Sequence, residues 1–197
     1  MTPRPSNILD QREIQRRGGR CAEAPVSCLV WDLIKELGIA WPAVLDVTYG
    51  VGGFWVAGKP ELLIGSDVKV WQWKVVPDVF ILSPSWAVHK VIKKLGLESR
   101  IDLVVIDPPW SSYTHRGRSY YTYAYGSDRD ILMGGLRTAR SIGAKYVLIH
   151  YREVLIPEGW ELIKKVKFIY VSRYLKNNNI NTSPNTTWFY TLTPKRP

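Results

Sequence analysis

Cysteine and histidine are scarce in this chain. Its 197 residues include two cysteines, Cys21 and Cys28, and three scattered histidines. The cysteine spacing is neither a CxxC pair nor part of a four-ligand zinc framework. We therefore expect the cysteines to be small residues in or near a core, and we expect no metal site.

Long apolar runs are also missing. No stretch approaches the roughly 18–20 apolar residues that cross a bilayer. The polar, Arg-rich N-terminus lacks the apolar segment of a secretory signal. The expectation is a cytoplasmic protein without a membrane partner.

Acidic residues are outnumbered, with 17 against 27 Lys and Arg, which gives a net charge of +10. Such an excess favours polyanionic partners, because each neutralised phosphate releases counterions. Nine Trp and eleven Tyr are many for this length, and flat aromatic rings also stack on bases. Charge and aromatic content together favour a nucleic-acid partner.

The order of apolar segments predicts one α/β domain over residues 21–197, preceded by a basic arm over residues 1–20 with a short helix at 9–17. Helices are expected at 25–38, at 87–97 and from a cap at Asp128 to 142. Apolar strands are expected at 43–48, 62–68, 79–82, 101–106 and 145–151. Alternating helices and buried strands indicate a mostly parallel sheet with helices on both faces. Two terminal strands, 162–174 and 187–193, are expected to form an antiparallel hairpin around an Asn-rich loop at 176–186.

A glycine-rich loop follows the first of these strands, at Leu45-Asp46-Val47-Thr48-Tyr49-Gly50-Val51-Gly52-Gly53. Glycines let the backbone take positive φ and let a ligand approach closely, and open α/β sheets bind nucleotides at this position. Asp67 ends the next strand, where an acid binds ribose hydroxyls. Because the loop lacks the Lys-Ser/Thr pair of a P-loop, a cofactor without pyrophosphate fits better than ATP or NAD.

The tetrapeptide Asp107-Pro108-Pro109-Trp110 follows the buried strand at 101–106. Together, the glycine loop and this tetrapeptide resemble the motifs of the S-adenosylmethionine-dependent amino-methyltransferases, the enzymes that modify adenine N6 or cytosine N4. In the glycine loop, Val47-Thr48 stands where the family has Pro-Phe. The resemblance implies a Rossmann-like methyltransferase fold and S-adenosylmethionine as cofactor. It also implies a cofactor site at Asp46, Thr48, Tyr49, Gly50, Gly52, Gly53 and Asp67, and catalysis by Asp107, Pro108, Pro109 and Trp110.

The tetrapeptide has a chemical rationale. An exocyclic amino nitrogen is a poor nucleophile because its lone pair is delocalised into the ring. The Asp107 carboxylate and the rigidly held Pro108 carbonyl can accept its two hydrogens, and Trp110 can stack on the base. The loop at 111–127 carries candidate substrate contacts, since its tyrosines can stack bases and its arginines can hold phosphates: Tyr113, His115, Arg116, Arg118, Tyr120 and Tyr121.

Three functions remain open on the sequence. The favoured one is methylation of an exocyclic amino group in nucleic acid, with RNA, for example ribosomal RNA, ahead of DNA. RNA is favoured because no separate target-recognition region is visible, and a recognition subunit could supply that role. The alternatives are methylation of a protein glutamine side chain and a non-catalytic RNA-binding module on the same fold.

Overall fold

A computed structural model describes residues 8–108, 127–152, 156–176 and 179–195, without side chains for 171–184. These residues form one sheet of eight strands in the order β1-β7-β8-β6-β5-β2-β3-β4. The bounds are β1 Ile8–Asp10, β2 Ala43–Asp46, β3 Leu62–Asp67, β4 Val79–Leu82, β5 Leu103–Ile106, β6 Tyr146–Tyr151, β7 Trp160–Lys176 and β8 Asn179–Pro194. Strands β4, β3, β2, β5 and β6 are parallel, whereas β8 is antiparallel to both β6 and β7. The expected fold class is confirmed.

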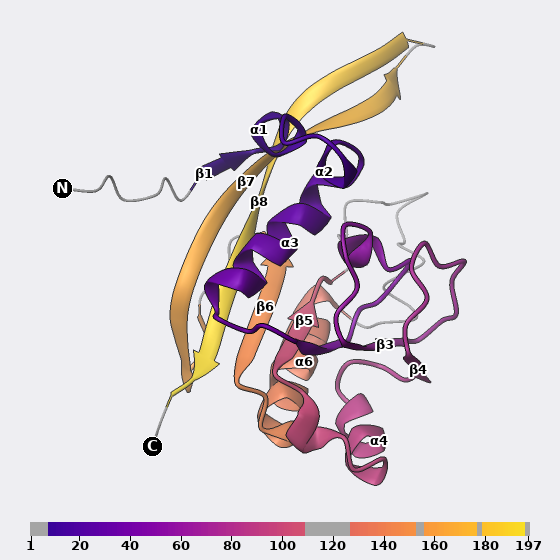
Figure 1. The fold of residues 1–197 in the computed structure, drawn as a ribbon, viewed down its shortest axis with the longest axis vertical. Helices are drawn as coiled ribbons and strands as arrows, with labels where there is room; N and C mark the ends of the chain where they lie inside the picture. The colour runs from indigo at the N-terminus through magenta and orange to yellow at the C-terminus, as the bar shows by residue number, and fades with distance from the viewer. Residues whose placement is uncertain (1–7, 109–126, 153–155, 177–178, 196–197) are drawn as a thin grey trace, which may run out of the picture.

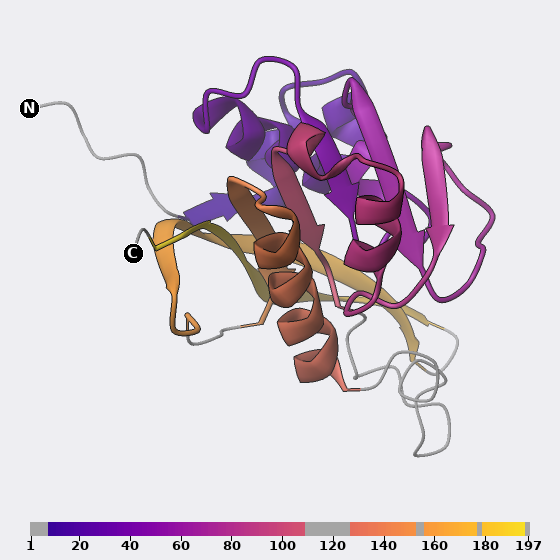
Figure 2. The same cartoon turned by 90° about the horizontal axis from the view of Figure 1, so that it is seen from below.

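Helices cover both faces of the sheet (Figures 1 and 2). On one face lie α1 Gln11–Gln15, α2 Arg20–Glu23, α3 Pro25–Glu36 and the short 3-10 helix η1 Gly53–Trp55. On the other lie α4 Val88–Lys94, the 3-10 helix η2 Glu98–Arg100 and α6 Asp128–Ile142. Successive strand residues alternate between the two cores: Val44, Leu103 and Val105 pack with α3, whereas Leu45, Val104 and Ile106 pack with α6. This alternation explains why the central strands are apolar throughout.

The helix ends follow local chemistry. Pro25 occupies the first turn of α3, where its missing N–H costs nothing. The cap of α6 is Ser127, one residue before the expected Asp128: its hydroxyl accepts from the N–H of Asp130, and the Asp130 side chain accepts from the Ser127 N–H. A serine with an acid three residues later is a capping box, and this reciprocal pair places the helix start. Gly143 ends α6 at φ 72°.

The prediction of an Asn-rich loop at 176–186 is wrong, because β7 runs to Lys176 and β8 begins at Asn179. The two strands pair along their full length, down to Lys176 with Asn179. Backbone pairing between strands outweighs the weak strand propensity of asparagine. Figure 1 shows this hairpin extending well past the ends of the other strands.

The N-terminal segment is part of the packed structure from residue 8 onward. β1 pairs with β7, and Ile14 in α1 is fully buried against the core beside α3. The short helix expected in this segment is present as α1. Cys21 and Cys28 form a disulfide between α2 and α3, a bond that their spacing did not predict. In the described part of the chain, no helix is both long enough and apolar enough to cross a membrane.

Candidate active site

Four polar side chains meet where neighbouring parallel strands end. Asp46 ends β2, Asp67 ends β3, Asp107 follows β5, and His150 lies one residue before the end of β6. The strand order β6-β5-β2-β3 makes these ends contiguous. In open α/β sheets this edge binds ligands, and the sequence placed three of these four residues there.

The glycine loop closes over Asp67. Gly50 and Gly52 have φ of 52° and 74°, the left-handed region that favours glycine. The Gly50 N–H donates to Oδ2 of Asp67 at 2.8 Å, and the Lys69 N–H donates to Oδ1 at 3.2 Å. The Asp67 carboxylate therefore ties the loop to the end of β3. Gly53 begins η1, and a Cβ there would meet no atom within 4 Å.

Tyr49, expected at the cofactor, is placed in the core. Its ring lies over Gly65 of β3, and its hydroxyl donates to the Val75 carbonyl at 2.7 Å. Burial raises the pKa of the hydroxyl well above its ordinary value. The role expected for Tyr49 remains a prediction, but its described contacts support the loop from beneath.

Asp46 is buried beneath the loop. Its Oδ2 accepts from Trp55 Nε1 at 2.9 Å, and its Oδ1 accepts from the Thr48 N–H at 3.1 Å. Burial raises the pKa of this carboxyl to about 7, against the lowering effect of these two donors, and the charges of Asp107 and Asp67 add to the rise. Because the charges of the three carboxylates interact, this edge of the sheet favours a cationic ligand over a phosphate.

Asp107 is held at both its backbone and its side chain. Its N–H donates to the Thr48 hydroxyl at 2.6 Å, which joins the tetrapeptide to the glycine loop. Its Oδ1 lies 2.9 Å from Nδ1 of His150. Pro108 is buried. The other expected residues lie outside the described part of the chain: Pro109, Trp110, Tyr113, His115, Arg116, Arg118, Tyr120 and Tyr121.

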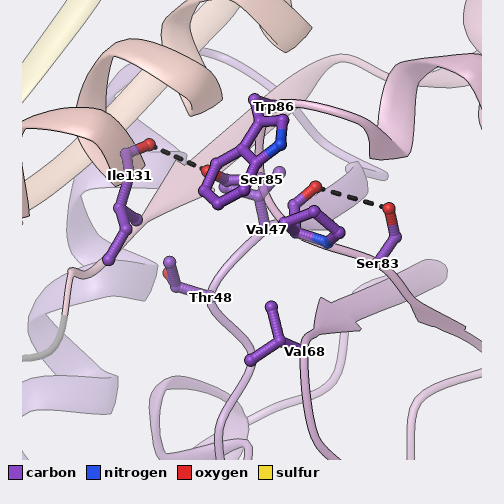
Figure 3. A pocket seen from close by; sticks show the side chains of 8 residues that line it. Val47, Thr48, Val68, Ser83, Ser85, Trp86 and Ile131 are labelled. Atoms are coloured by element: carbon purple, nitrogen blue, oxygen red, sulfur yellow. Dashed lines mark hydrogen bonds between the residues drawn. The ribbon is translucent and has the colours of Figure 1, made fainter. Parts of the chain in front are cut away.

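A narrow crevice, too tight to hold a water molecule, lies beside Thr48 between the ends of β2, β3 and β4. Figure 3 shows Val68 and Thr48 on one side of it and Trp86 on the other. Ser85 is tied to the helix α6 by a 3.0 Å hydrogen bond to the Ile131 carbonyl. The lining is mainly apolar with two serines: Val47, Thr48, Val68, Ser83, Pro84, Ser85, Trp86 and Ile131.

Two residues at this edge were missed on the sequence, Trp55 and His150. Trp55 follows the glycine loop by two residues, and nothing local marks its indole as the donor to Asp46. His150 had a usable signal, because it lies near the end of a buried strand, as Asp107 does. The pairing of Ile106 with Ile149 then places Asp107 beside His150.

Comparison with known proteins finds similarity only to solved structures, and at low sequence identity. No family model matches the chain, and no curated protein matches it. Among solved structures, a candidate RNA methyltransferase from Pyrococcus horikoshii is 17% identical, with a TM-score of 0.48, and the match covers 86% of this chain and 84% of that one.

Two further structures are similar at the same level. A candidate DNA modification methyltransferase encoded within an E. coli prophage has 11% identity and a TM-score of 0.48, and the match covers 78% of this chain and 47% of that one. The magnesium protoporphyrin IX methyltransferase of Synechocystis, solved with bound S-adenosylmethionine, has 10% identity and a TM-score of 0.45, with 94% and 84% covered. Since all three TM-scores are below 0.5, the function has to be inferred from this chain's own residues.

Proposed function

We propose that this protein transfers a methyl group from S-adenosylmethionine to the exocyclic amino group of a base in nucleic acid. The observation that best supports this proposal is the 2.6 Å hydrogen bond from the Asp107 N–H to the Thr48 hydroxyl. This bond brings the first residue of the Asp-Pro-Pro-Trp tetrapeptide to the glycine loop. A methyl-transfer site needs this proximity, because donor and acceptor must react in line.

The charges of the site fit this cofactor. S-adenosylmethionine carries a sulfonium and an ammonium group, and it has no phosphate. Asp67 and Asp107 supply negative charge at neighbouring strand ends, and Asp46, whose pKa is about 7, adds part of a charge near neutral pH. This charge attracts those cations. A dinucleotide or nucleoside triphosphate would bring phosphates into the same negative field. The loop's open glycine backbone allows a close approach of the ligand.

We expect the adenine part of such a cofactor to enter the crevice beside Thr48, whose walls would have to move apart to admit it. Val68 and Trp86 offer apolar surfaces on opposite sides, as Figure 3 shows, and a flat heteroaromatic ring packs well between such groups. The Ser83 N–H is taken by the Asp67 carbonyl, and the hydroxyls of Ser83 and Ser85 donate to the carbonyls of Pro84 and Ile131. The two hydroxyl oxygens are therefore expected to accept hydrogen bonds from the amino group of the adenine. S-adenosylmethionine would supply an electrophilic methyl group.

The tetrapeptide would prepare the amino nitrogen for attack. The Asp107 carboxylate accepts one amino hydrogen and the Pro108 carbonyl accepts the other, which draws the nitrogen lone pair out of the ring. Bound S-adenosylmethionine would supply the methyl group to this nitrogen and would leave as S-adenosylhomocysteine. The nitrogen then loses one proton to the Asp107 carboxylate, which passes it to solvent, so charge and atoms balance.

The substrate is inferred to be nucleic acid, with RNA ahead of DNA. A base must leave its stack to enter such a pocket, and a net charge of +10 favours binding of the phosphate backbone. The charge gives no reason to favour a glutamine side chain of a protein. The candidate stacking residues are those of the loop at 111–127.

The test is methyl transfer from isotopically labelled S-adenosylmethionine. Unmodified ribosomal RNA, transfer RNA and genomic DNA are each incubated with the protein, digested to nucleosides and analysed by mass spectrometry. We expect label in N4-methylcytidine or N6-methyladenosine from an RNA pool. Label in the deoxynucleosides would move the substrate to DNA, and label in no pool, with cofactor binding confirmed by calorimetry, would overturn the proposal.

Asp107→Ala is the critical variant, with an expected loss of at least about 100-fold in kcat and retained cofactor binding. Asp102→Ala is the matched control. Asp102 flanks the opposite end of β5, where it accepts from the Ala43 N–H and from Lys145, and its removal should leave kcat unchanged. Equal activity of Asp107→Ala and wild type would remove the catalytic role of the tetrapeptide.

A further inference from the structure

The contact between His150 and Asp107 has no role in the methyl transfer described above. Nδ1 of His150 lies 2.9 Å from Oδ1 of Asp107. An ionised carboxylate only accepts hydrogen bonds, so Nδ1 must carry the hydrogen in this pair. The His150 side chain is 11% exposed and that of Asp107 is 33% exposed. The buried partner is therefore the donor, and the carboxylate reaches toward the open edge of the sheet.

The imidazole ring is held rigidly. It stacks on Phe189, its cross-strand neighbour in β8, with centroids 4.3 Å apart and planes 19° apart. The ring of Phe54 meets it edge-on at 5.5 Å. A ring packed by two aromatic neighbours has little rotational freedom, so the direction of the Nδ1–H bond is set before any substrate arrives.

Asp107 is therefore held by two hydrogen bonds, one at its backbone and one at its side chain. The Thr48 hydroxyl holds its backbone N–H, and His150 holds one side-chain oxygen. A carboxylate that binds an amino hydrogen must hold its position closely, because errors near 1 Å cost large factors in rate. When Asp46 is ionised, its charge repels that of Asp107 at the same edge, and a hydrogen-bond donor at Oδ1 offsets that repulsion.

We propose that His150 is a positioning residue which donates to Oδ1 of Asp107 and so holds Oδ2 toward the amino group that is methylated. This inference rests on the proposed function. His150 keeps its own proton throughout: the proton released by the methylated nitrogen passes to Oδ2 and then to solvent. The histidine acts through the carboxylate and does not touch the base.

Two variants of His150 separate its hydrogen bond from its packing. His150→Phe keeps a ring against Phe189 and Phe54 but removes the donor. His150→Asn removes the ring but places an amide N–H near the position of Nδ1. We expect His150→Phe to lower kcat about 10- to 100-fold while the KM for S-adenosylmethionine stays within about twofold of wild type. We expect His150→Asn to recover a large part of kcat.

Comparing the kcat values of the two variants distinguishes a positioning role of His150 from a purely structural one. A purely structural histidine would make His150→Phe the more active variant, since it conserves the packing. The inference is overturned if His150→Phe has the kcat of wild type, or if it exceeds His150→Asn. Thermal unfolding of each variant establishes that the compared proteins are folded.

A second measurement keeps this inference distinct from the proposed function. In wild-type protein labelled with ¹⁵N-histidine, the NMR signals of His150 should show hydrogen on Nδ1, and Asp107→Ala should shift them. Unchanged His150 signals in Asp107→Ala would overturn the inference even if the enzyme is active. If wild type methylates no substrate while these signals shift, the proposed function fails, and with it the positioning role, although the hydrogen bond itself is established.

Discussion

At the scale of single residues, Asp46 couples the stability of the fold to pH. Its carboxyl has a folded-state pKa of about 7 against an ordinary value of 3.8. Between these two values the folded protein retains a proton that the unfolded chain has released. The free energy of unfolding therefore falls as pH rises from about 4 to about 7, and the full cost is present above pH 7.

Asp46→Asn should remove this part of the pH dependence. The rise of the Asp46 pKa from 3.8 to about 7 corresponds to roughly 4 kcal/mol at most, so the slope of stability between pH 4 and 7 should become visibly flatter. An asparagine also turns an amide N–H₂ toward one of the two donors, Trp55 or Thr48, and this cost does not depend on pH. The slope, measured by urea unfolding at several pH values, is thus the informative quantity.

The control for this slope is Asp102→Asn, at the opposite end of β5. Its carboxylate is paired with Lys145, and its replacement should leave the slope between pH 4 and 7 close to that of wild type. Equal slopes for Asp46→Asn and wild type would show that Asp46 is ionised throughout this range in the folded protein.

The site residues fall into two groups: those that can be recognised from the residues next to them in the sequence, and those whose role depends on a partner brought close by the fold. Asp46, Asp67 and Asp107 can be recognised from the local sequence, because each lies at the end of an apolar strand. In addition, Asp46 belongs to the glycine-loop motif and Asp107 to the tetrapeptide. Trp55 and His150 act through partners that the sequence does not place beside them. His150 meets Asp107 only because Ile106 pairs with Ile149, and strand register is a property of the assembled sheet.

At the scale of elements, the glycine loop rests on β3 through Tyr49. A Cβ at Gly65 would lie 2.7 Å from Cγ of the Tyr49 ring, closer than van der Waals contact permits. Gly65→Ala should force the ring and the loop away from the strand, at a cost of about 1–3 kcal/mol in the free energy of unfolding. Thermal and urea unfolding measure this cost.

Gly53→Ala is the matched control, since a Cβ at Gly53 meets nothing within 4 Å and its φ is not positive. It should change stability by less than about 1 kcal/mol. Gly65→Ala should also weaken binding of S-adenosylmethionine, because the displaced loop is the proposed cofactor site. A Gly65→Ala protein as stable as wild type would mean that Tyr49 moves aside without strain.

The elements that sequence patterns predicted are those with strong internal periodicity. The helices α3 and α6 and the central strands fall within the expected ranges. The far half of the β7–β8 hairpin and the strand β1 were not predicted, since both form by pairing with segments distant in the sequence. Asparagine-rich composition and a basic N-terminus gave no local indication of strand structure.

At the scale of the whole molecule, the β7–β8 hairpin extends past the edge of the sheet that holds the candidate site. β8 is antiparallel to both β6 and β7, so β7 runs in the direction of β6. The last residue of β6, Tyr151, pairs with Trp188, which pairs in turn with Lys167 of β7. From this level β7 continues to Lys176, and Figure 1 shows the hairpin reaching beyond the end of β5. Asp107 directly follows that strand.

Two lysines of β7 lie over aromatic rings of β8 on one face. Lys165 Nζ is 4.2 Å from the centroid of the Trp188 ring, and Lys167 Nζ is 5.8 Å from the same centroid. These cation–π contacts hold the two charges near the sheet surface. If the substrate backbone crosses this face on its way to Asp107, both lysines contact phosphates.

The Lys165→Gln/Lys167→Gln double variant should then bind RNA more weakly and with less salt dependence. On a single strand, each lost phosphate contact reduces the slope of log affinity against log salt by about 0.7, so the expected change is about 1.4. The control is Lys93→Gln/Lys94→Gln at the end of α4, which removes the same charge elsewhere. Fluorescence anisotropy across a salt series distinguishes two cases. A reduced slope for the β7 pair alone locates the nucleic acid on the hairpin, whereas equal changes for both pairs would mean that affinity follows the net charge of +10 and no particular face.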